Sequence, residues 1–402
     1  MLDMDVDILI VGGGVIGATL MLALAPLGLR VCLIDARPLS TDVVSHLDGR
    51  NLALSPASIR ILSQLGVWSR IVEFATPIQA IHISEEGRFG QARLLGSKEH
   101  PLGTVVGMQA LTKALWSMID LKHVIAPATL IHYDKHTQTA TIKTGDNEGT
   151  IRSKMIVAAD GSDSVLRQIC NVSIKTKHYG QAAIVANIGL ARSHQNKAYE
   201  RFTPKGPMAL LPLLGKHVAL IWTLPPEEAS ALMTSTPDNF LRALQRAFGY
   251  RLGRFVSVGQ RTSFDLREIR LAHQVVDHVV FVGNAAHTLH PVAGQGFNLG
   301  LRDVAALAEC IAKNGLSDET FLNYQALRRS DQETILSFTD GLIRLFTSTI
   351  PGVSHLRSFG LMVFDNMPFL KTIMKRYAGG FGGVLPALVC DLPITTEENL
   401  HA

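Results

Sequence analysis

Three glycines at fixed spacing near the N-terminus constrain this 402-residue chain more than any other feature. The segment DILIVGGGVIGATL is an apolar run, then Gly12, Gly14 and Gly17, then a run typical of a helix. In such a turn the first glycine permits a tight bend, the second lets the backbone approach a pyrophosphate, and the third lets helix and strand pack closely. The pyrophosphate then lies at the helix N-terminus, beside Val15. The pattern predicts a strand–turn–helix unit that binds a dinucleotide.

A second strand of this unit is predicted over residues 30–34. It ends at Asp35, where a carboxylate is expected to bind the adenosine ribose, and Arg37 follows in the same loop. The 22 residues from 8 to 29 carry no charge, and a run of this length could span a bilayer. Aspartates precede this run and glycines interrupt it, so we expect a buried strand and a core helix rather than a membrane span or a secretory signal.

A second glycine-rich element, GNAAHTLHPVAGQGFNLGLRD, covers residues 283–303. It also follows an apolar run and precedes a helical pattern. Between the two elements, residues 153–159 read as a strand that leads to Asp160-Gly161, which in isolation is an ordinary turn. Two glycine-rich elements so far apart in sequence indicate one long cofactor held at both ends, which is typical of a flavin.

Composition favours a large intracellular enzyme of more than one domain. The four cysteines contain no CxxC pair and the 15 histidines show no ligand spacing, so we expect free thiols and no metal. The net charge is only +4 and the basic residues are scattered, which argues against nucleic acid as a partner. We expect a cytoplasmic protein, with peripheral contact to the inner membrane left open.

Together the three motifs resemble those of the class A flavoprotein monooxygenases, the FAD-dependent aromatic hydroxylases, over essentially the whole chain. That family combines an N-terminal GxGxxG, a central Asp-Gly segment and a late GDxxHxxxPxxGxGxN element. The resemblance implies an α/β fold, with a Rossmann-like FAD-binding domain of the glutathione-reductase/hydroxylase type, a β-sheet substrate domain and C-terminal helices. It also implies FAD as the cofactor, with NADPH or NADH as a transient electron donor.

The same resemblance implies further FAD contacts. Asp160 is expected near the pyrophosphate, and backbone N–H groups from Gly294 to Asn298 would stabilise negative charge on the reduced flavin. Asn284 stands where the family usually has aspartate; an amide keeps the hydrogen bonding to the ribityl chain but loses the charge. The full set expected at the FAD beyond the first turn is Arg50, Gln109, Asp160, Gly283, Asn284, Pro291, Gly294, Gln295, Gly296 and Asn298.

Three longer segments narrow the resemblance. GNAAHTLHPVAGQGFNLGLRDVAALAE, YERFTPKGPMALLPL and AFGYRLGR are similar to the ubiquinone-biosynthetic hydroxylases, most of all to those that act on 2-polyprenyl-6-methoxyphenol. The resemblance implies a polyprenyl phenol and O2 as substrates, with a flavin C4a-hydroperoxide delivering oxygen to the para carbon to give the 1,4-benzoquinol. Two alternatives stay open: a sibling hydroxylase that acts at another ring position, and a non-catalytic flavoprotein with an assembly or redox-sensing role.

The domain organisation follows from strand and helix patterns. We expect a discontinuous FAD-binding domain over residues 1–75, 105–175 and 270–325, a substrate domain over 76–104 and 176–269, and a helical region over 326–402. These last helices either pack on the flavin domain or face a membrane or a ubiquinone-biosynthesis complex. An apolar pocket over the flavin is expected to be lined by Phe202, Pro207, Leu210 and Pro212.

No residue is assigned as a catalytic acid or base. His287 and His290 lie in the late loop, and histidine titrates in a suitable range, which makes them the candidates for such a role. A histidine beside a turn more often has a structural role.

Overall fold

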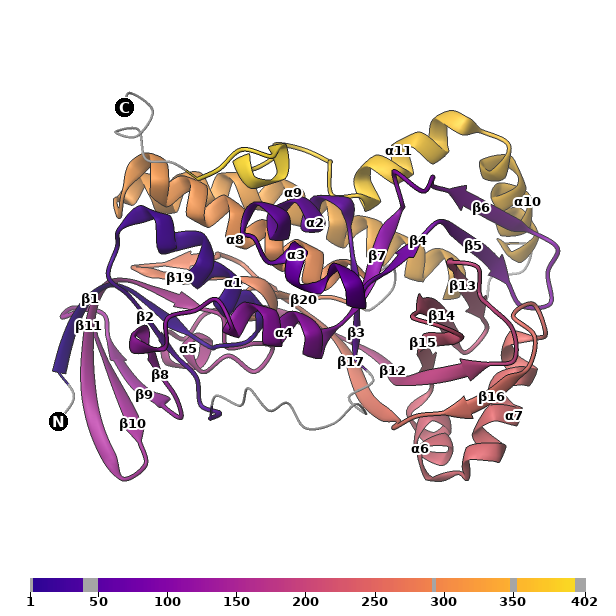
Figure 1. Cartoon of the computed structure of the whole chain (residues 1–402), viewed down its shortest axis with the longest axis horizontal. Helices are drawn as coiled ribbons and strands as arrows, with labels where there is room; N and C mark the ends of the chain where they lie inside the picture. The colour runs from indigo at the N-terminus through magenta and orange to yellow at the C-terminus, as the bar shows by residue number, and fades with distance from the viewer. Residues whose placement is uncertain (1–2, 39–49, 291–293, 348–352, 395–402) are drawn as a thin grey trace.

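The computed structural model describes residues 3–38, 50–290, 294–347 and 353–394 (Figure 1). It confirms the expected α/β architecture, with a nucleotide-binding type of sheet at one end and a second, larger sheet at the other. The uncharged run over residues 8–29 forms a buried strand and a core helix, as expected. The division of the chain into domains stays a prediction.

The first sheet holds the expected parallel strands. Val11, at the end of β1, pairs with Ile34 of β2 and with Ala158 of β11, and Ala158 pairs with Phe281 of β19. The carboxyl ends of these strands therefore meet at one edge of the sheet, where ligands of such folds bind. Its strands are β1 (Asp3–Val11), β2 (Val31–Ile34), β8 (Val124–Ile125), β9 (Thr129–Asp134), β10 (Thr139–Thr144), β11 (Asn147–Ala158), β18 (Val275–Val276) and β19 (Val279–Phe281).

Helices cover this sheet with apolar side chains. Ile8 and Ile10 of β1 are fully buried in one cluster with Leu20 of the first helix and Leu301 of a long later helix. The helices of this part are α1 (Val15–Leu24), α2 (Pro56–Gln64), α3 (Trp68–Ile71), α4 (Met108–Trp116), α5 (Val165–Ile169), α8 (Gln295–Asn314) and α9 (Asp318–Thr347). Short 3-10 turns lie at η1 (Ala25–Leu27), η2 (Val72–Phe74), η3 (Leu121–His123) and η4 (Gly283–Ala285).

The second sheet has nine strands among the described residues, in the order β20-β17-β12-β15-β14-β13-β5-β6, with β16 paired to β12. One face packs against α6 (Pro226–Thr234) and α7 (Pro237–Phe248), where Phe240 stacks edge-on with Trp222 at 6.0 Å between ring centroids. Its strands are β5 (Ala80–Glu85), β6 (Gln91–Leu95), β12 (Ile174–Leu190), β13 (Lys197–Thr203), β14 (Gly206–Leu213), β15 (His217–Leu224), β16 (Phe255–Val258), β17 (Thr262–Leu271) and β20 (His287–Thr288).

A small third sheet joins the two ends, with β7 (Gly103–Gly107) between β3 (Asn51–Leu54) and β4 (Thr76–Ile78). In the C-terminal region, α9 packs along α8, which agrees with the expected contact to the nucleotide-binding part. The next helices, α10 (Val353–Asp365) and α11 (Pro368–Ala378), lie over the second sheet instead, and α10 contacts β6 (Figure 1). A 3-10 turn, η6 (Ala387–Cys390), follows. None of the helices in the described part of the chain has the length and apolarity needed to cross a bilayer.

Candidate active site

The first glycine turn leaves an open space at the start of α1. A Cβ atom on Gly12, whose φ is +108°, would lie 2.5 Å from the carbonyl oxygen of Ala159, and one on Gly17 would lie 1.9 Å from the oxygen of Gly12. A Cβ atom on Gly14 would meet no atom within 4 Å. Gly14 is the N-cap residue of α1 and no side chain caps the helix, so its free N–H groups can receive a pyrophosphate.

Asp35 closes this turn from the end of β2. Its carboxylate accepts hydrogen bonds from the backbone N–H of Gly13 at 2.6 Å and of Arg37 at 2.8 Å, while the Arg37 side chain is mostly exposed. The aspartate is thereby fixed beside the glycine turn at the carboxyl edge of the sheet. This is the place where a ribose would follow a pyrophosphate bound at α1.

The central and late motifs are tied together by Arg167. Its guanidinium donates to the backbone carbonyl oxygens of Ser162 and, at 3.0 Å, of Ala285. In the same segment, Oδ2 of Asp160 accepts from the backbone N–H of Val165 at 2.8 Å. Its other oxygen, Oδ1, is buried and has no hydrogen-bond partner among the described residues. A polar group of a ligand at this edge of the sheet would satisfy that oxygen, so the residues here suit a cofactor such as FAD.

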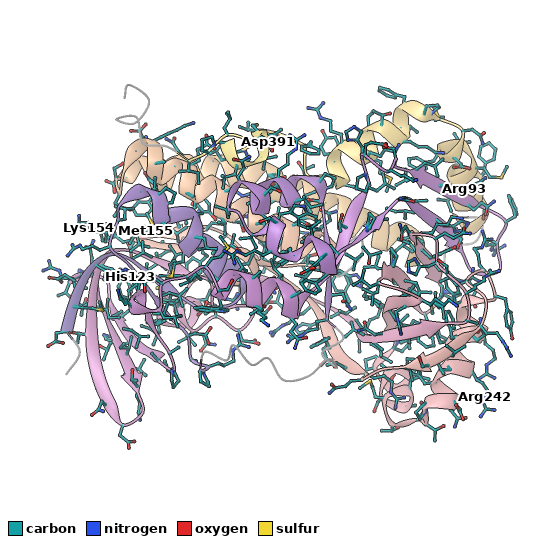
Figure 2. The ribbon with its side chains drawn as sticks, in the orientation of Figure 1. Arg93, His123, Lys154, Met155, Arg242 and Asp391 are labelled. Atoms are coloured by element: carbon teal, nitrogen blue, oxygen red, sulfur yellow. The ribbon has the colours of Figure 1, made fainter. Side chains whose placement is uncertain are left out.

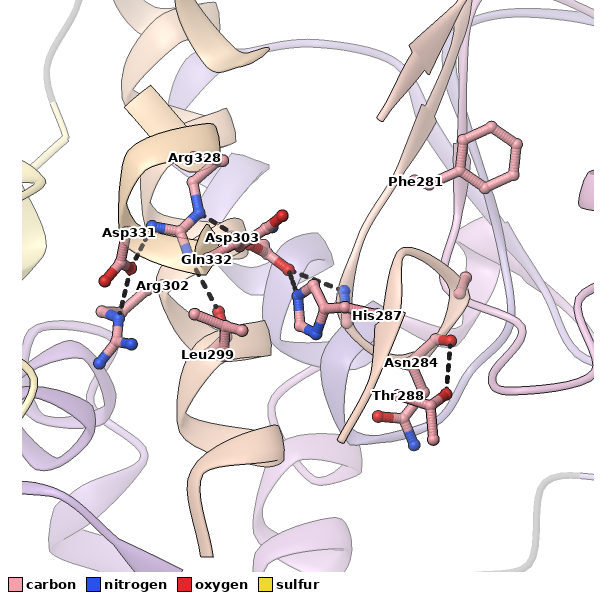
Figure 3. A network of polar contacts seen from close by, with 12 residues as sticks. Phe281, Asn284, His287, Thr288, Leu299, Arg302, Asp303, Arg328, Asp331 and Gln332 are labelled. Atoms are coloured by element: carbon pink, nitrogen blue, oxygen red, sulfur yellow. Dashed lines mark hydrogen bonds and ion pairs between the residues drawn. The ribbon is translucent and has the colours of Figure 1, made fainter. Parts of the chain in front are cut away.

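Behind the late motif lies a buried polar network that the sequence did not predict (Figure 3). The carboxylate of Asp303 accepts four hydrogen bonds: from Gly283 N at 2.9 Å, His287 Nε2 at 2.6 Å, Arg328 Nε at 2.7 Å and Gln332 Nε2 at 3.1 Å. Burial alone would raise the pKa of Asp303, but His287 and Arg328 outweigh it and hold the pKa well below its usual range. The network fixes η4 and β20 to α8 and α9.

The two candidate histidines have different surroundings. His287 is 1% exposed and contacts Asp303, so its position is structural. His290 lines a cavity of about 920 Å³ and stacks edge-on with Tyr179 at 4.9 Å between ring centroids. Burial lowers the pKa of His290 to about 4, so this imidazole is neutral near pH 7. Tyr179 in turn donates to Glu268 at 2.7 Å.

The start of α8 is held in place by side chains of the motif itself. Gly294 precedes the helix with a left-handed φ of +59°. The amide nitrogen of Asn298 donates to the backbone oxygens of Ala53 and Gly294, and its Oδ1 accepts from Ser58 Oγ at 2.7 Å. Gln295 donates to the backbone oxygen of Ala378 at 3.4 Å. These contacts orient the N-terminus of a 20-residue helix toward the cavity, where its dipole favours negative charge.

The other expected FAD residues lie around the same region. Arg50 precedes β3, and its backbone oxygen accepts from Met108 N at 3.1 Å, which brings Arg50 and Gln109 to adjacent element ends. Asn284 is exposed and lines the cavity. Gly283 and Gly296 belong to η4 and to the first turn of α8. Pro291 lies outside the described residues.

A cavity of about 920 Å³ extends from the late loop across the second sheet to α10 and α11. Most of its lining is apolar, and Phe202 of β13 contributes to it. On β14 the cavity is lined by Ala209 and Leu211. The expectation for Leu210 is therefore corrected: it points to the opposite face, into the cluster under α6 and α7, because side chains alternate along a strand. Pro207 and Pro212, which were also expected there, are not among the described residues that line the cavity.

One carboxylate lies in this apolar lining, at a position that was not predicted from the sequence. Glu200 sits on β13 between Ala198 and Phe202, on the same face, and all three line the cavity. Burial raises the pKa of Glu200 to about 8. The segment YERFT contains a clue, because its side chains alternate between the two faces of a strand, and a charged residue on an otherwise apolar face is unusual. Which face is turned to the cavity could be known only from the register of the sheet.

Comparisons with known proteins agree with this geometry. A family model described as an FAD binding domain matches residues 5–339. The ubiquinone hydroxylase UbiL of Rhodospirillum rubrum is 36% identical over 98% of this chain and 94% of its own length. The 3-demethoxyubiquinol 3-hydroxylase of Escherichia coli is 30% identical over 94% of this chain and 100% of its own length.

Among solved structures, p-nitrophenol 4-monooxygenase PnpA from Pseudomonas putida superposes with a TM-score of 0.78 at 16% identity. The alignment covers 96% of this chain and 100% of that one, which shows that the fold is shared. With the FAD-binding model and two ubiquinone-pathway relatives matched over most of its length, this chain belongs to the FAD-dependent class A monooxygenases, in the family of the ubiquinone-biosynthesis hydroxylases.

Proposed function

We propose that this enzyme uses NADPH or NADH and dioxygen to hydroxylate the aromatic ring of a polyprenyl phenol. The first candidate reaction converts 2-polyprenyl-6-methoxyphenol to the 1,4-benzoquinol. The single observation that carries the proposal is the cavity of about 920 Å³, which extends from the late glycine loop along an apolar lining of strands and helices. Such a space suits a ring at the loop end and an isoprenoid tail along the apolar lining. FAD, when bound and reduced, supplies the chemistry that activates dioxygen for transfer of one oxygen atom.

The residues at the sheet edge would hold the cofactor. Gly14 and the N-terminus of α1 would receive the pyrophosphate, and Asp35 would bind the ribose. Asp160 has a buried, unpartnered oxygen at the same edge among the described residues. The N-terminus of α8 would face the isoalloxazine and stabilise its negative charge when reduced.

The cavity walls would position the ring and keep water away from it. Leu52 and Phe297 lie near the loop end, while Leu361, Phe364 and Met374 close the cavity from α10 and α11. Holding a reactive ring in one orientation and excluding solvent are the main contributions a protein makes to oxygen transfer from a bound cofactor.

A peripheral contact with the membrane is part of the proposal. Helices α10 and α11 are apolar on the side that faces the cavity and also on the outer side. The exposed apolar residues in and between these helices, among the side chains that the structure describes, are Phe359, Met362, Val363, Met367, Phe369, Ile373 and Tyr377. Exposed apolar surface of this kind is typical of a membrane or protein contact. A polyprenyl tail could then pass from lipid into the cavity between these helices.

Cationic side chains gather at the same end of the molecule, on the face of the second sheet that is turned away from α10 and α11. A pocket of about 570 Å³ lies on the reverse face of β5, β6 and β13. It is lined by four cationic side chains and, among the described residues, no carboxylate; the cations are Arg93, Arg192, Lys197 and Arg251. Figure 2 shows Arg93 on β6 at the end of the molecule where α10 lies.

The ring position has a second candidate, because the Escherichia coli relative is named a 3-demethoxyubiquinol 3-hydroxylase. The test is complementation of two bacterial strains, one lacking its methoxyphenol hydroxylase and one lacking its demethoxyubiquinol hydroxylase. Mass spectrometry of lipid extracts would follow the accumulated precursor and ubiquinone in each strain. We expect rescue of the first strain; rescue of the second alone would move the reaction to that ring position.

Failure in both strains, with flavin-loaded protein present, would contradict the proposed activity. In that case, retention of FAD without substrate-stimulated oxidation of NADPH or NADH would support the non-catalytic alternative instead.

A further inference from the structure

Glu200 has an unusual setting for a carboxylate. It lies in the middle of β13, opposite Ala209 of β14 and Ile83 of β5, and these three residues all line the cavity. From the other side, Leu361 and Phe364 of α10 and Met374 of α11 complete the lining. The side chain is partly buried, and it faces the cavity as its neighbours Ala198 and Phe202 do.

The carboxylate is also without a partner within the described residues. No hydrogen bond or ion pair joins Glu200 to any group in residues 3–38, 50–290, 294–347 or 353–394. The other titratable side chains that line the cavity are Tyr199, on the same strand, and His290, on the late loop. A carboxylate left alone in apolar surroundings lowers the stability of the fold. An apolar residue would fill the same place better, so packing does not account for Glu200.

We propose that Glu200 is the catalytic residue that receives the hydroxyl group of the phenolic substrate, first as a hydrogen-bond acceptor and then as the acceptor of its proton. In this step the O–H bond of the phenol breaks and an O–H bond forms on the carboxylate. The electron pair stays on the phenolate oxygen and increases the electron density of the ring. No oxidant is needed, and the inference rests on the proposed function.

The environment suits this role. A general base works best when its pKa lies near the working pH, and burial raises the pKa of Glu200 to about 8. Only the ionised form can accept a proton, so the rate of product formation is expected to rise as the pH rises through about 8. His290 is a much weaker base, because burial lowers the pKa of its imidazole to about 4.

The test uses the flavin-loaded enzyme and its Glu200→Gln variant, with 2-geranylphenol and the O-methyl ether of that phenol as probes. Binding is followed without oxygen through the absorbance change of the flavin, and hydroxylated product is measured by mass spectrometry across the pH range. The wild type should bind the phenol more tightly than its ether, and Glu200→Gln should lose this preference. Product formation should fall by about 10²-fold or more and lose its rise near the pKa.

Glu85→Gln is the matched control. Glu85 is a buried carboxylate on β5, on the same face of the same sheet, but it does not line the cavity. Its variant should keep both the phenol preference and the pH profile. FAD content should be unchanged in both variants, and reduction by NADPH without substrate should be unchanged in Glu85→Gln.

The possible outcomes distinguish the role of Glu200 from the proposed function. Equal product formation and an equal pH profile in Glu200→Gln and wild type would overturn the role of Glu200 and leave the proposed function standing. A wild type that prefers the phenol through Glu200 but forms no hydroxylated product would overturn the proposed function and keep Glu200 as the hydroxyl-binding group. A wild type that does not distinguish phenol from ether would overturn the inference directly.

Discussion

Oδ2 of Asp303 lies 2.6 Å from Nε2 of His287, and both side chains are almost completely buried. His287 belongs to β20, directly after the η4 turn that carries Asn284, while Asp303 belongs to α8. The same carboxylate accepts a hydrogen bond from the backbone N–H of Gly283 at 2.9 Å. One carboxylate therefore sets the distance between the η4 turn and the helix whose N-terminus faces the cavity.

Arg328 completes this network from α9, and its loss should be costly. Its guanidinium is 2% exposed and binds both Asp303 and Asp331. Removing one partner of a buried ion pair leaves an uncompensated charge, which typically costs about 3–5 kcal/mol. We expect Arg328→Ala to lower the free energy of unfolding by about that amount, measured by urea denaturation of the holoenzyme.

The adjacent residue provides the control. Arg329 pairs with Glu333, but both side chains are well exposed, so Arg329→Ala should change stability by less than about 1 kcal/mol. Equal losses in the two variants would show that the buried network contributes no more than a surface pair.

The sequence predicted the glycine turn and the meeting of the three motifs because their signals are local. Each motif follows an apolar strand, and parallel strands of one sheet bring their carboxyl ends together. The Asp303 network could not be predicted, because Arg328 and Gln332 reach Asp303 from another helix. Their sequence shows only polar residues on a helix, with no indication of which side is buried.

The sequence also does not show which face of a sheet each side chain of a strand occupies. Phe202 lines the cavity, whereas Leu210 lies on the opposite face of the second sheet. A shift of one residue in register exchanges the two faces, and the sequence alone does not fix the register of β14. For the same reason the sequence left Glu200 unassigned, although it is the only carboxylate among the described residues of the cavity lining.

A substitution in the first glycine turn should abolish cofactor binding without preventing folding. Gly14→Val places its side chain in open space, so the chain should fold, but the valine would block the approach of a pyrophosphate. We expect a protein with a normal circular dichroism spectrum that purifies without FAD, measured as the ratio of flavin to protein absorbance.

Gly17→Ala should behave differently. Its Cβ atom would lie 1.9 Å from the carbonyl oxygen of Gly12, so α1 must move away from β1. Such overpacking typically costs about 1–3 kcal/mol, and the urea midpoint should fall. A Gly14→Val protein that retains full flavin would contradict the assignment of this turn to the pyrophosphate.

The outer faces of α10 and α11 predict binding to lipid. Phe359 and Phe369 are 62% and 71% exposed, so their substitution should disturb the fold very little. We expect Phe359→Ser/Phe369→Ser to reduce cosedimentation with vesicles of phosphatidylglycerol and phosphatidylethanolamine, because exposed apolar side chains provide much of the affinity of a helix for the bilayer interface.

Leu121→Ser is the control for this experiment. Leu121 is 54% exposed in η3, which lies at the opposite end of the molecule, near the labelled His123 in Figure 2. Its variant should bind vesicles as the wild type does. Equal binding by all three proteins would show that α10 and α11 do not contact the membrane.

Glu200 finally predicts a pH dependence of stability that is independent of any substrate. Burial raises its pKa from the ordinary 4.5 to about 8, so the folded protein binds this proton more tightly than the unfolded chain. The stability that this proton contributes is complete below the unfolded pKa and is lost as the pH rises through about 8. Glu200→Gln cannot ionise, so its free energy of unfolding should not show this loss. Between about pH 6 and about pH 9, the free energy of unfolding of the wild type should therefore fall by at least about 1.4 kcal/mol relative to that of the variant, measured by urea denaturation. This amount corresponds to a difference of about one pKa unit. Parallel pH curves for the two proteins would mean that the Glu200 carboxyl is solvated as an ordinary surface group, and the base proposed for the phenol would lose its physical support.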